Sequence, residues 1–239
     1  LRNRVKEIAA RRFRKPARPA PAARQKPASA PSAAAKKKAA APTGGRLVRD
    51  IITIGVSTGG PSTVELIFSD LPANFPWPIL VAQHMPARFT RVFAERLNTR
   101  CPLTVREVDG PTPLQIGEIL IGRGESDVVV GRRAGKRVAL NMPPDNSLWH
   151  PSVDRMVRSA MEHFQPGHLI GVELTGMGCD GAAAMSELHS QGGQTIAESE
   201  ASAVVFGMPK ELIDRGGAEV VLAADEVAGR LRAWTEGRR

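Results

Sequence analysis

Cysteine and tyrosine are scarce in this sequence, which has two cysteines, Cys101 and Cys179, and no tyrosine. Two cysteines are too few for a disulfide framework, and they lack the paired spacing of a zinc site. We therefore expect reduced thiols and no bound metal.

Long apolar runs are also missing. No segment approaches the roughly 18 consecutive apolar residues that a membrane-spanning helix requires, and no charged start followed by an apolar stretch resembles a signal peptide. We expect a cytoplasmic protein without membrane insertion.

Because the sequence begins at Leu1 and not at Met, we also expect a fragment that lacks an upstream partner.

Positive charge is concentrated at one end of the 239-residue chain. Residues 1–50 hold 15 of the 33 Lys and Arg residues and 2 of the 24 acidic residues, so their net charge is +13 and that of residues 51–239 is −4. The hydrophobic share of 42% is enough for the core of one ordinary domain. The uneven charge argues against nucleic-acid binding by the whole protein.

The basic end divides into two segments. Apolar residues at helical spacing predict a short amphipathic helix over residues 1–13, which we interpret as the last helix of a missing domain. Residues 14–46 consist mainly of Ala, Pro, Lys and Arg, and cannot bury enough apolar surface to offset chain entropy. They predict a disordered basic linker, with a DNA-contacting tail as the alternative.

Short β-branched runs alternate with amphipathic helices from Arg49 onward, which predicts a globular domain over residues 47–235. We expect strands at 51–56, 79–82, 169–174, 195–197 and 220–223, and helices at 64–71, 89–97, 153–161, 182–189, 209–214 and 225–234. This alternation predicts an α/β fold, a doubly wound and mostly parallel sheet with helices on both faces. Four extended runs break the rhythm and predict a small antiparallel hairpin or subsheet: 103–108, 118–121, 127–130 and 137–140.

Ser57 lies in a Gly-x-Ser-x-Gly pattern, between Gly55 and Gly59, after the first strand and before the first helix. This is the context of a nucleophile elbow, where small neighbours let the turn close and expose the hydroxyl at the carboxyl edge of the sheet. A glycine-rich turn that holds a phosphate is the alternative, although the lysine of a P-loop and the full dinucleotide fingerprint are missing.

His84 follows the second strand, and Asp180 lies in a glycine-rich turn after the strand at 169–174. Carboxyl ends of neighbouring parallel strands meet at one rim, so these residues can converge with Ser57 as base, orienting carboxylate and nucleophile. Taken singly, each has a structural alternative: a rim histidine satisfied by its surroundings, and an aspartate that caps a helix.

Other candidates have weaker contexts. Asp154 competes with Asp180 for the carboxylate role, but it follows His150 by four residues and could form a local pair with it. Cys179 gains no thiolate stabilisation from its neighbour Asp180, so we interpret it as a bystander. We interpret the four remaining histidines as structural or surface residues: His150, His163, His168 and His189.

Five ordered motifs resemble the catalytic domain of the chemotaxis protein-glutamate methylesterases, the CheB family. They are Ile-Gly-Val-Ser-Thr-Gly-Gly-Pro at 54–61, Ala-Gln-His-Met-Pro at 82–86, His-Pro-Ser-Val-Asp at 150–154, Leu-Thr-Gly-Met-Gly-Cys-Asp-Gly-Ala at 174–182 and Val-Val-Phe-Gly-Met-Pro at 204–209. The resemblance extends over about residues 47–235.

The resemblance implies a serine hydrolase whose triad is Ser57, His84 and Asp180. Its substrates would be glutamate methyl esters, and selected glutamines, on cytoplasmic helices of methyl-accepting chemotaxis receptors. The backbone amides of Thr58 and Met177 are our candidates for the oxyanion hole. No metal or organic cofactor is needed. The family also implies an amino-terminal receiver domain, phosphorylated through a histidine kinase, whose last helix would be residues 1–13.

Three features depart from the family pattern. Gly122-Arg123-Gly124 stands where the family usually has Ala-Pro-Gly, and Glu198 stands where Gln is common. The linker over residues 14–46 is also unusually long and basic. These departures leave receptor preference and additional partners open.

Two rival functions can be weighed from the sequence. A small-molecule esterase of the α/β-hydrolase fold would have its triad in the order Ser, Asp or Glu, His, whereas here His84 precedes Asp180. A nucleotide- or nucleic-acid-binding module would use the basic end as an anchor. The seven Phe and three Trp are scattered and form no stacking platform near that end, so nucleic acid is not an expected partner.

Overall fold

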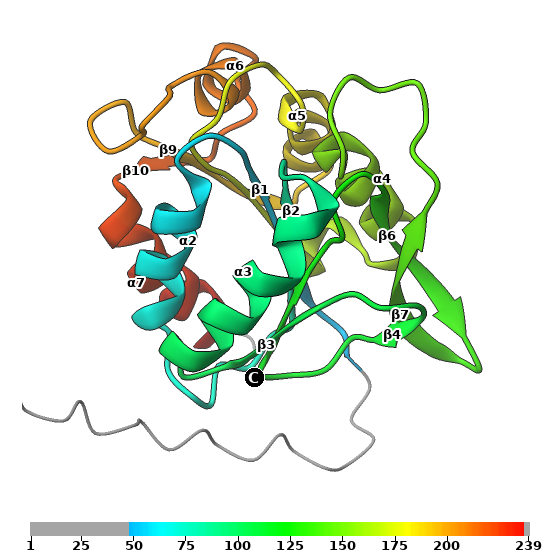
Figure 1. Cartoon of the computed structure of the whole chain (residues 1–239). Coiled ribbons are helices and arrows are strands. Elements are labelled where there is room, and N and C mark those ends of the chain that lie inside the picture. Colours follow the sequence, from blue (N-terminus) through cyan, green and yellow to red (C-terminus); the bar gives the residue numbers. More distant parts are fainter. Residues whose placement is uncertain (1–47, 237–239) are drawn as a thin grey trace, which may run out of the picture. The chain divides into compact units, whose positions relative to one another are not determined.

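A computed structural model describes residues 48–236, so the helix expected at 1–13 and the linker expected at 14–46 lie outside the described residues. The main sheet has seven strands in the order β10-β9-β8-β1-β2-β5-β3, and every neighbouring pair is parallel. Figure 1 shows how these strands lie among the helices. Their bounds are β1 Ile51–Val56, β2 Ile79–Gln83, β3 Thr104–Glu107, β5 Glu118–Ile121, β8 Leu169–Glu173, β9 Gln194–Glu198 and β10 Val220–Leu222.

The sheet reverses its direction of growth at β1. From β1 the chain proceeds through β2 towards the β3 edge, then returns to place β8 on the other side of β1. All residues of β1, β2 and β8 are buried, as expected for strands covered on both faces. Ligands of open α/β sheets bind at such a reversal, beyond the carboxyl ends of the strands. This topology brings the segments after β1, β2 and β8 together.

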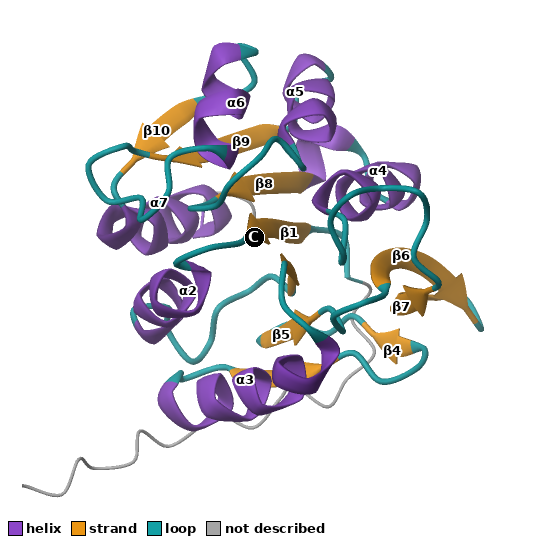
Figure 2. Cartoon of the chain, turned by 45° about the horizontal axis from the view of Figure 1, so that its top comes forward, coloured by secondary structure: helices purple, strands orange, loops and turns teal. Residues whose placement is uncertain are grey.

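Helices cover both faces of the sheet (Figure 2). One core packs side chains of α2, α3 and α7 against the sheet, and the other packs α4, α5 and α6 against the opposite face. The helices are α2 Gly60–Ser69, α3 Ala87–Arg100, α4 Val153–His163, α5 Ala182–Ser190, α6 Met208–Asp214 and α7 Ala224–Glu236, with a short 3-10 helix, η1, at Pro166–His168. None of the helices between residues 48 and 236 is long and apolar enough to cross a membrane.

A separate three-stranded antiparallel sheet packs beside α4, in the order β4-β7-β6. It consists of β4 Thr112–Pro113, β6 Asp127–Arg133 and β7 Lys136–Met142. The expected hairpin is therefore confirmed for β6 and β7. The runs at 103–108 and 118–121 instead contribute β3 and β5 to the main parallel sheet, because Val105, Ile119 and Ile121 join the core under α3. Short extended runs do not by themselves distinguish the two pairings.

Candidate active site

Ser57 is the first residue after β1, and hydrogen bonds fix its backbone on both sides. Its N–H donates to the Thr175 carbonyl at 2.9 Å, which ties it to the segment after β8. Its carbonyl accepts from the Gly60 N–H at 2.9 Å and from the Gln83 side-chain amide at 2.9 Å. Gln83 ends β2, so a side chain from the neighbouring strand holds the turn that carries the serine.

The turn after Ser57 needs glycine at position 59. Gly59 has φ +86°, a left-handed conformation, and a Cβ there would lie within 3 Å of two Val204 side-chain atoms. This tight strand-to-helix turn is the geometry expected for a nucleophile elbow. The expected exposure is not found, because Ser57 is 8% exposed and lies in a covered site.

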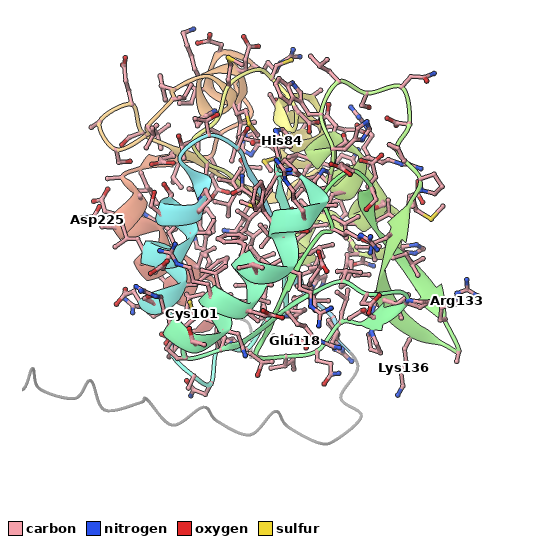
Figure 3. All side chains as sticks on the ribbon, viewed as in Figure 1. His84, Cys101, Glu118, Arg133, Lys136 and Asp225 are labelled. Atoms are coloured by element: carbon pink, nitrogen blue, oxygen red, sulfur yellow. The ribbon has the colours of Figure 1, made fainter. Side chains whose placement is uncertain are left out.

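His84 extends β2 by one residue, and its N–H donates to the Val56 carbonyl at 3.0 Å. Its imidazole Nε2 lies 2.9 Å from Asp180 Oδ2, and its side chain is 5% exposed. The other nitrogen, Nδ1, has no hydrogen-bond partner within residues 48–236. Val56 and Gln83 are register partners, so Ser57 and His84 follow paired positions of adjacent strands. Figure 3 shows His84 at the end of the sheet opposite Glu118.

Asp180 binds the start of helix α4 as well as His84. Its carboxylate accepts from the Val153 N–H at 2.7 Å, the Asp154 N–H at 3.0 Å and the Ser152 hydroxyl at 3.1 Å. Burial alone would raise the pKa of Asp180, but the hydrogen bonds from His84 and the two amides outweigh it and hold the pKa below its usual value. The carboxylate is therefore an oriented anion beside His84.

The alternative that Asp180 caps its own helix is wrong in detail, since α5 begins at Ala182 with Gly181 before it. Asp180 caps α4 instead. Asp154, in the first turn of α4, in turn accepts from the Ala184 N–H of α5 at 2.8 Å. Burial raises the pKa of Asp154, and the nearby Asp180 adds to this rise. Asp180 thus caps α4, and Asp154 caps α5.

Asp154 does not pair with His150, which corrects the local pair considered from their spacing. His150 Nδ1 lies 2.8 Å from Asp127 Oδ1. Asp127, fully buried at the start of β6, also accepts from the Ser152 N–H at 2.7 Å and from Arg155 at 2.7 Å. Asp127, Asp145 and His150 have ligand atoms within 4.8 Å of one another. Because both oxygens of Asp127 already have protein donors, this cluster is explained as an anchor of the loop before α4.

The proposed oxyanion donors, the amides of Thr58 and Met177, make no hydrogen bond to other described residues. The Thr58 carbonyl accepts from the Thr175 hydroxyl at 2.8 Å, and the Thr175 N–H donates to Glu198 Oε2 at 2.8 Å. Burial raises the pKa of Glu198, and hydrogen bonds from the Thr175 N–H and the Ser202 hydroxyl lower it in part. Glu198 thereby supports the segment between the two candidate amides, a role that sequence reasoning missed.

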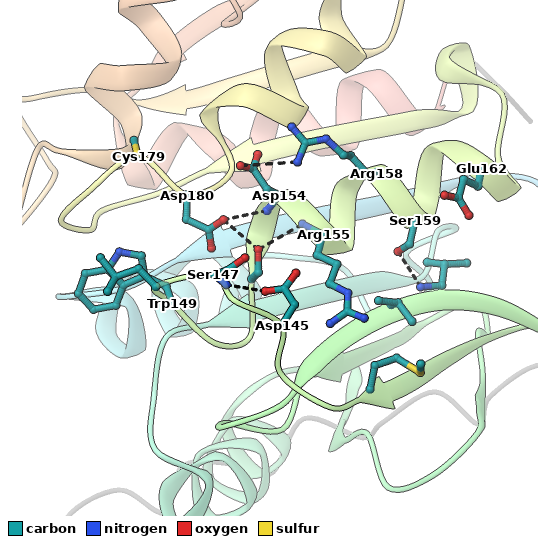
Figure 4. Close-up of a pocket in the computed structure, with 15 residues that line it drawn as sticks. Asp145, Ser147, Trp149, Asp154, Arg155, Arg158, Ser159, Glu162, Cys179 and Asp180 are labelled. Atoms are coloured by element: carbon teal, nitrogen blue, oxygen red, sulfur yellow. Dashed lines mark hydrogen bonds and ion pairs between the residues drawn. The ribbon is translucent and has the colours of Figure 1, made fainter.

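Trp149 was also missed. Its ring stacks on His84 with 5.5 Å between ring centroids and an interplanar angle of 11°. It lines a cavity of about 670 Å³ beside Asp180, together with Met142, Leu148 and Arg155. Figure 4 shows Trp149 at this cavity with Asp180 and Asp154. Its position directly before the motif at 150–154 was the only signal in the sequence.

Cys179 is exposed and Cys101 is buried, and neither forms a disulfide. No interaction in the described part of the chain links Cys179 to His84. His168 lies 2.6 Å from Asp50, at the opposite end of β8 from Asp180.

Ser57, His84 and Asp180 thus follow three adjacent parallel strands, with histidine bound to an oriented carboxylate. This arrangement is typical of serine hydrolases built on α/β sheets. The model of the family described as CheB methylesterase matches residues 52–231. The chain belongs to the CheB methylesterase family, as its motifs predicted.

Relatives of known name support this assignment. The chain is 56% identical over 185 residues to protein-glutamate methylesterase/protein-glutamine glutaminase 3 of Rhodospirillum rubrum, and 51% identical over 185 residues to a protein of the same name, numbered 2, in Rhodopseudomonas palustris. Each alignment covers 77% of this chain and 50% of the relative, so the chain spans about half the length of these relatives.

The crystal structure of the Thermotoga maritima CheB methylesterase catalytic domain has the same fold. Its TM-score is 0.73 at 38% identity, over 76% of this chain and 96% of that one. The predicted doubly wound α/β fold is therefore confirmed.

Proposed function

We propose that this chain hydrolyses glutamate methyl esters on methyl-accepting chemotaxis receptors. The observation that carries the proposal is the His84–Asp180 pair, at 2.9 Å, in which His84 follows the strand next to the one that precedes Ser57. The names of the relatives supply the substrate class.

His84 is the general base of this mechanism. An ionised carboxylate only accepts hydrogen bonds, so the Nε2 that faces Asp180 carries the proton and Nδ1 is the basic atom. Nδ1 takes the proton of the Ser57 hydroxyl as Oγ attacks the ester carbonyl. Asp180 holds the imidazole in this tautomer and stabilises the imidazolium.

Two steps complete the reaction. The tetrahedral oxyanion is stabilised by the Thr58 and Met177 amides, the C–O bond to the methoxy group breaks, and His84 returns the proton so that methanol leaves. Water then attacks the acyl-enzyme with His84 as base. The ester bond to Ser57 Oγ breaks, His84 returns the proton to Oγ, and the glutamate side chain is released. With a glutamine side chain, the same sequence releases ammonia, which corresponds to the glutaminase in the relatives' names.

The proposal extends to the organisation of the protein. Residues 47–235 are its catalytic domain, residues 14–46 a linker, and residues 1–13 the end of an amino-terminal receiver domain that a histidine kinase phosphorylates. The relatives are about twice as long as the aligned region, which leaves room for such a domain. Chemotaxis receptors present their methylation sites in the cytoplasm, so the protein acts there.

Methanol release from methylated receptor by the purified chain tests this function. The receptor is supplied in membranes with labelled methyl esters, and a parallel sample of unmethylated receptor with glutamine at the same sites is assayed for ammonia. We expect methanol from the first sample at a rate well above that without protein. Folded chain that releases no methanol from any methylated receptor would contradict the proposal.

A further inference from the structure

Glu173, the last residue of β8, is a buried carboxyl group that has no hydrogen-bond partner between residues 48 and 236. It is 0% exposed, and neither carboxyl oxygen makes a hydrogen bond to any described residue. Burying an ionised carboxylate without a hydrogen bond or a cation is far more costly than burying the neutral acid. The mechanism above gives this group no role.

The Glu173 carboxyl fills the space between the nucleophile strand and the Asp180 turn. A Cβ at Gly55, two residues before Ser57, would lie 2.8 Å from Glu173 Oε1. A Cβ at Gly181 would overlap Oε2 and would lie 2.6 Å from a methyl group of Val153. The two glycines therefore leave room for the Glu173 carboxyl and the Val153 side chain, which lie between both catalytic segments.

The charges that face Glu173 are both negative. Its carboxyl lies beside Gly55 of β1 and Gly181 of the turn before α5, where Val153 of α4 also packs, and its backbone is paired with Ala197 of β9. From these elements Asp180 and Asp154 act on it, and no cation between residues 48 and 236 offsets them. Burial, followed by the charges of Asp180 and Asp154, raises the pKa of Glu173 well above the usual 4.5.

We infer that Glu173 is a positioning residue that works as a neutral acid, supporting the Asp180 turn and the Ser57 strand from below. An uncharged carboxyl fills this space without placing a third negative charge beside Asp180 and Asp154. An ionised Glu173 would instead favour the protonated form of the His84–Asp180 pair, because it would add a third negative charge beside it. The positioning role rests on the proposed esterase function, whereas the neutral state does not.

Thermal unfolding of wild type and Glu173→Gln at several pH values tests the neutral state. In the unfolded chain Glu173 loses its proton near pH 4.5, whereas the folded protein keeps it above that pH. The folded state then binds one more proton, so this group reduces stability progressively as pH rises towards its raised folded pKa. Glutamine has the same shape and no proton to lose. The Tm of Glu173→Gln should therefore rise relative to wild type between about pH 5 and about pH 8.

A difference in Tm that stays constant or shrinks over this range would overturn the neutral state. Glu118→Gln is the matched control, because Glu118 of β5 is also buried but is ion-paired with Arg106. It should lower the Tm at neutral pH, since it leaves Arg106 without its partner.

Esterase kinetics test the positioning role. Glu173→Ala removes the support, and kcat should fall roughly tenfold or more, because small misplacements of catalytic groups are costly. Glu173→Gln fills the same space, so its kcat should stay close to that of wild type. The acid limb of its kcat/KM profile should also lie at the same pH as in wild type. A limb that moves to lower pH in Glu173→Gln would show that Glu173 was charged, and an unchanged kcat in Glu173→Ala would refute positioning. If Glu173→Ala does not fold, Glu173→Asp, whose side chain is one methylene shorter, takes its place, and an unchanged kcat in that variant would refute positioning. If wild type lacks esterase activity, the proposed function fails, while the Tm comparison still decides the neutral state.

Discussion

Asp180 caps helix α4, which contains Asp154, and Asp154 caps helix α5, which begins just after Asp180. Asp180, just before α5, accepts the first amides of α4 at 2.7 and 3.0 Å, and Asp154, in α4, accepts the Ala184 amide of α5 at 2.8 Å. Only Asp180 also binds His84. The two carboxylates therefore share a structural task, and the proposed mechanism gives Asp180 a catalytic task as well.

Replacing the two aspartates separates these tasks. Asp180→Asn should lower kcat by a factor on the order of 10² to 10⁴, because the amide no longer controls the His84 tautomer. Asp154→Ala should reduce the free energy of unfolding by about 1 kcal/mol through loss of a helix cap, with a much smaller effect on kcat. Steady-state kinetics and urea unfolding of both variants provide the measurement. A greater loss of kcat in Asp154→Ala would require the triad to be reassigned.

Stability at acid pH should depend on Asp180. Its pKa lies below the usual 3.8 in the folded protein, so its contribution to stability is fully present above pH 3.8 and is lost as pH falls through the folded pKa. Unfolding at a series of pH values should show a shallower loss of stability below pH 3.8 in Asp180→Asn than in wild type. Equal slopes in the two proteins would mean that the folded state does not hold this carboxylate ionised.

The stacked ring of Trp149 should contribute to the orientation of His84. Trp149→Ala should lower kcat/KM up to about tenfold, since an aromatic contact of this kind provides roughly 0.5–1.5 kcal/mol. Trp149→Phe keeps a stacking ring and should recover most of the activity. If phenylalanine and alanine were equally damaging, the ring stack would not be the cause, and contacts of the indole with substrate in the 670 Å³ cavity would explain the loss.

The sequence was sufficient for the fold class and for the rim positions of the three residues, because both follow from local patterns. Buried runs mark strands, and Ser57, His84 and Asp180 follow directly after strands or in the glycine-rich turn beyond one. The partners of these residues come from distant parts of the chain and leave no local pattern. Asp180 is bound by amides 26 and 27 residues away, and His150 pairs with Asp127, 23 residues away.

Other misses have the same physical origin. Glu173 lies within a run that reads as an ordinary buried strand, and only the packing of Gly55 and Gly181 around it reveals its environment. The parallel pairing of β3 and β5 depends on the core under α3, which short extended runs do not encode.

Regulation by a receiver domain gives a further expectation. Residues 1–239 expressed alone should be active without phosphorylation, because the proposed receiver domain, which would restrain the site, is not among them. A full-length protein should be slower until its receiver is phosphorylated. Methanol release by both proteins, with and without a phosphoryl donor, provides the comparison. Equal rates in all four samples would exclude inhibition by the receiver domain.

The most direct measurement of the central claim is kcat for methanol release by Ser57→Ala. Ser57 is the proposed nucleophile, so its loss should lower kcat by a factor on the order of 10³ or more. The Tm should stay close to that of wild type, because the Ser57 hydroxyl makes no hydrogen bond to other described residues and its backbone bonds remain. Activity within tenfold of wild type, in a variant that folds normally, would contradict the serine mechanism.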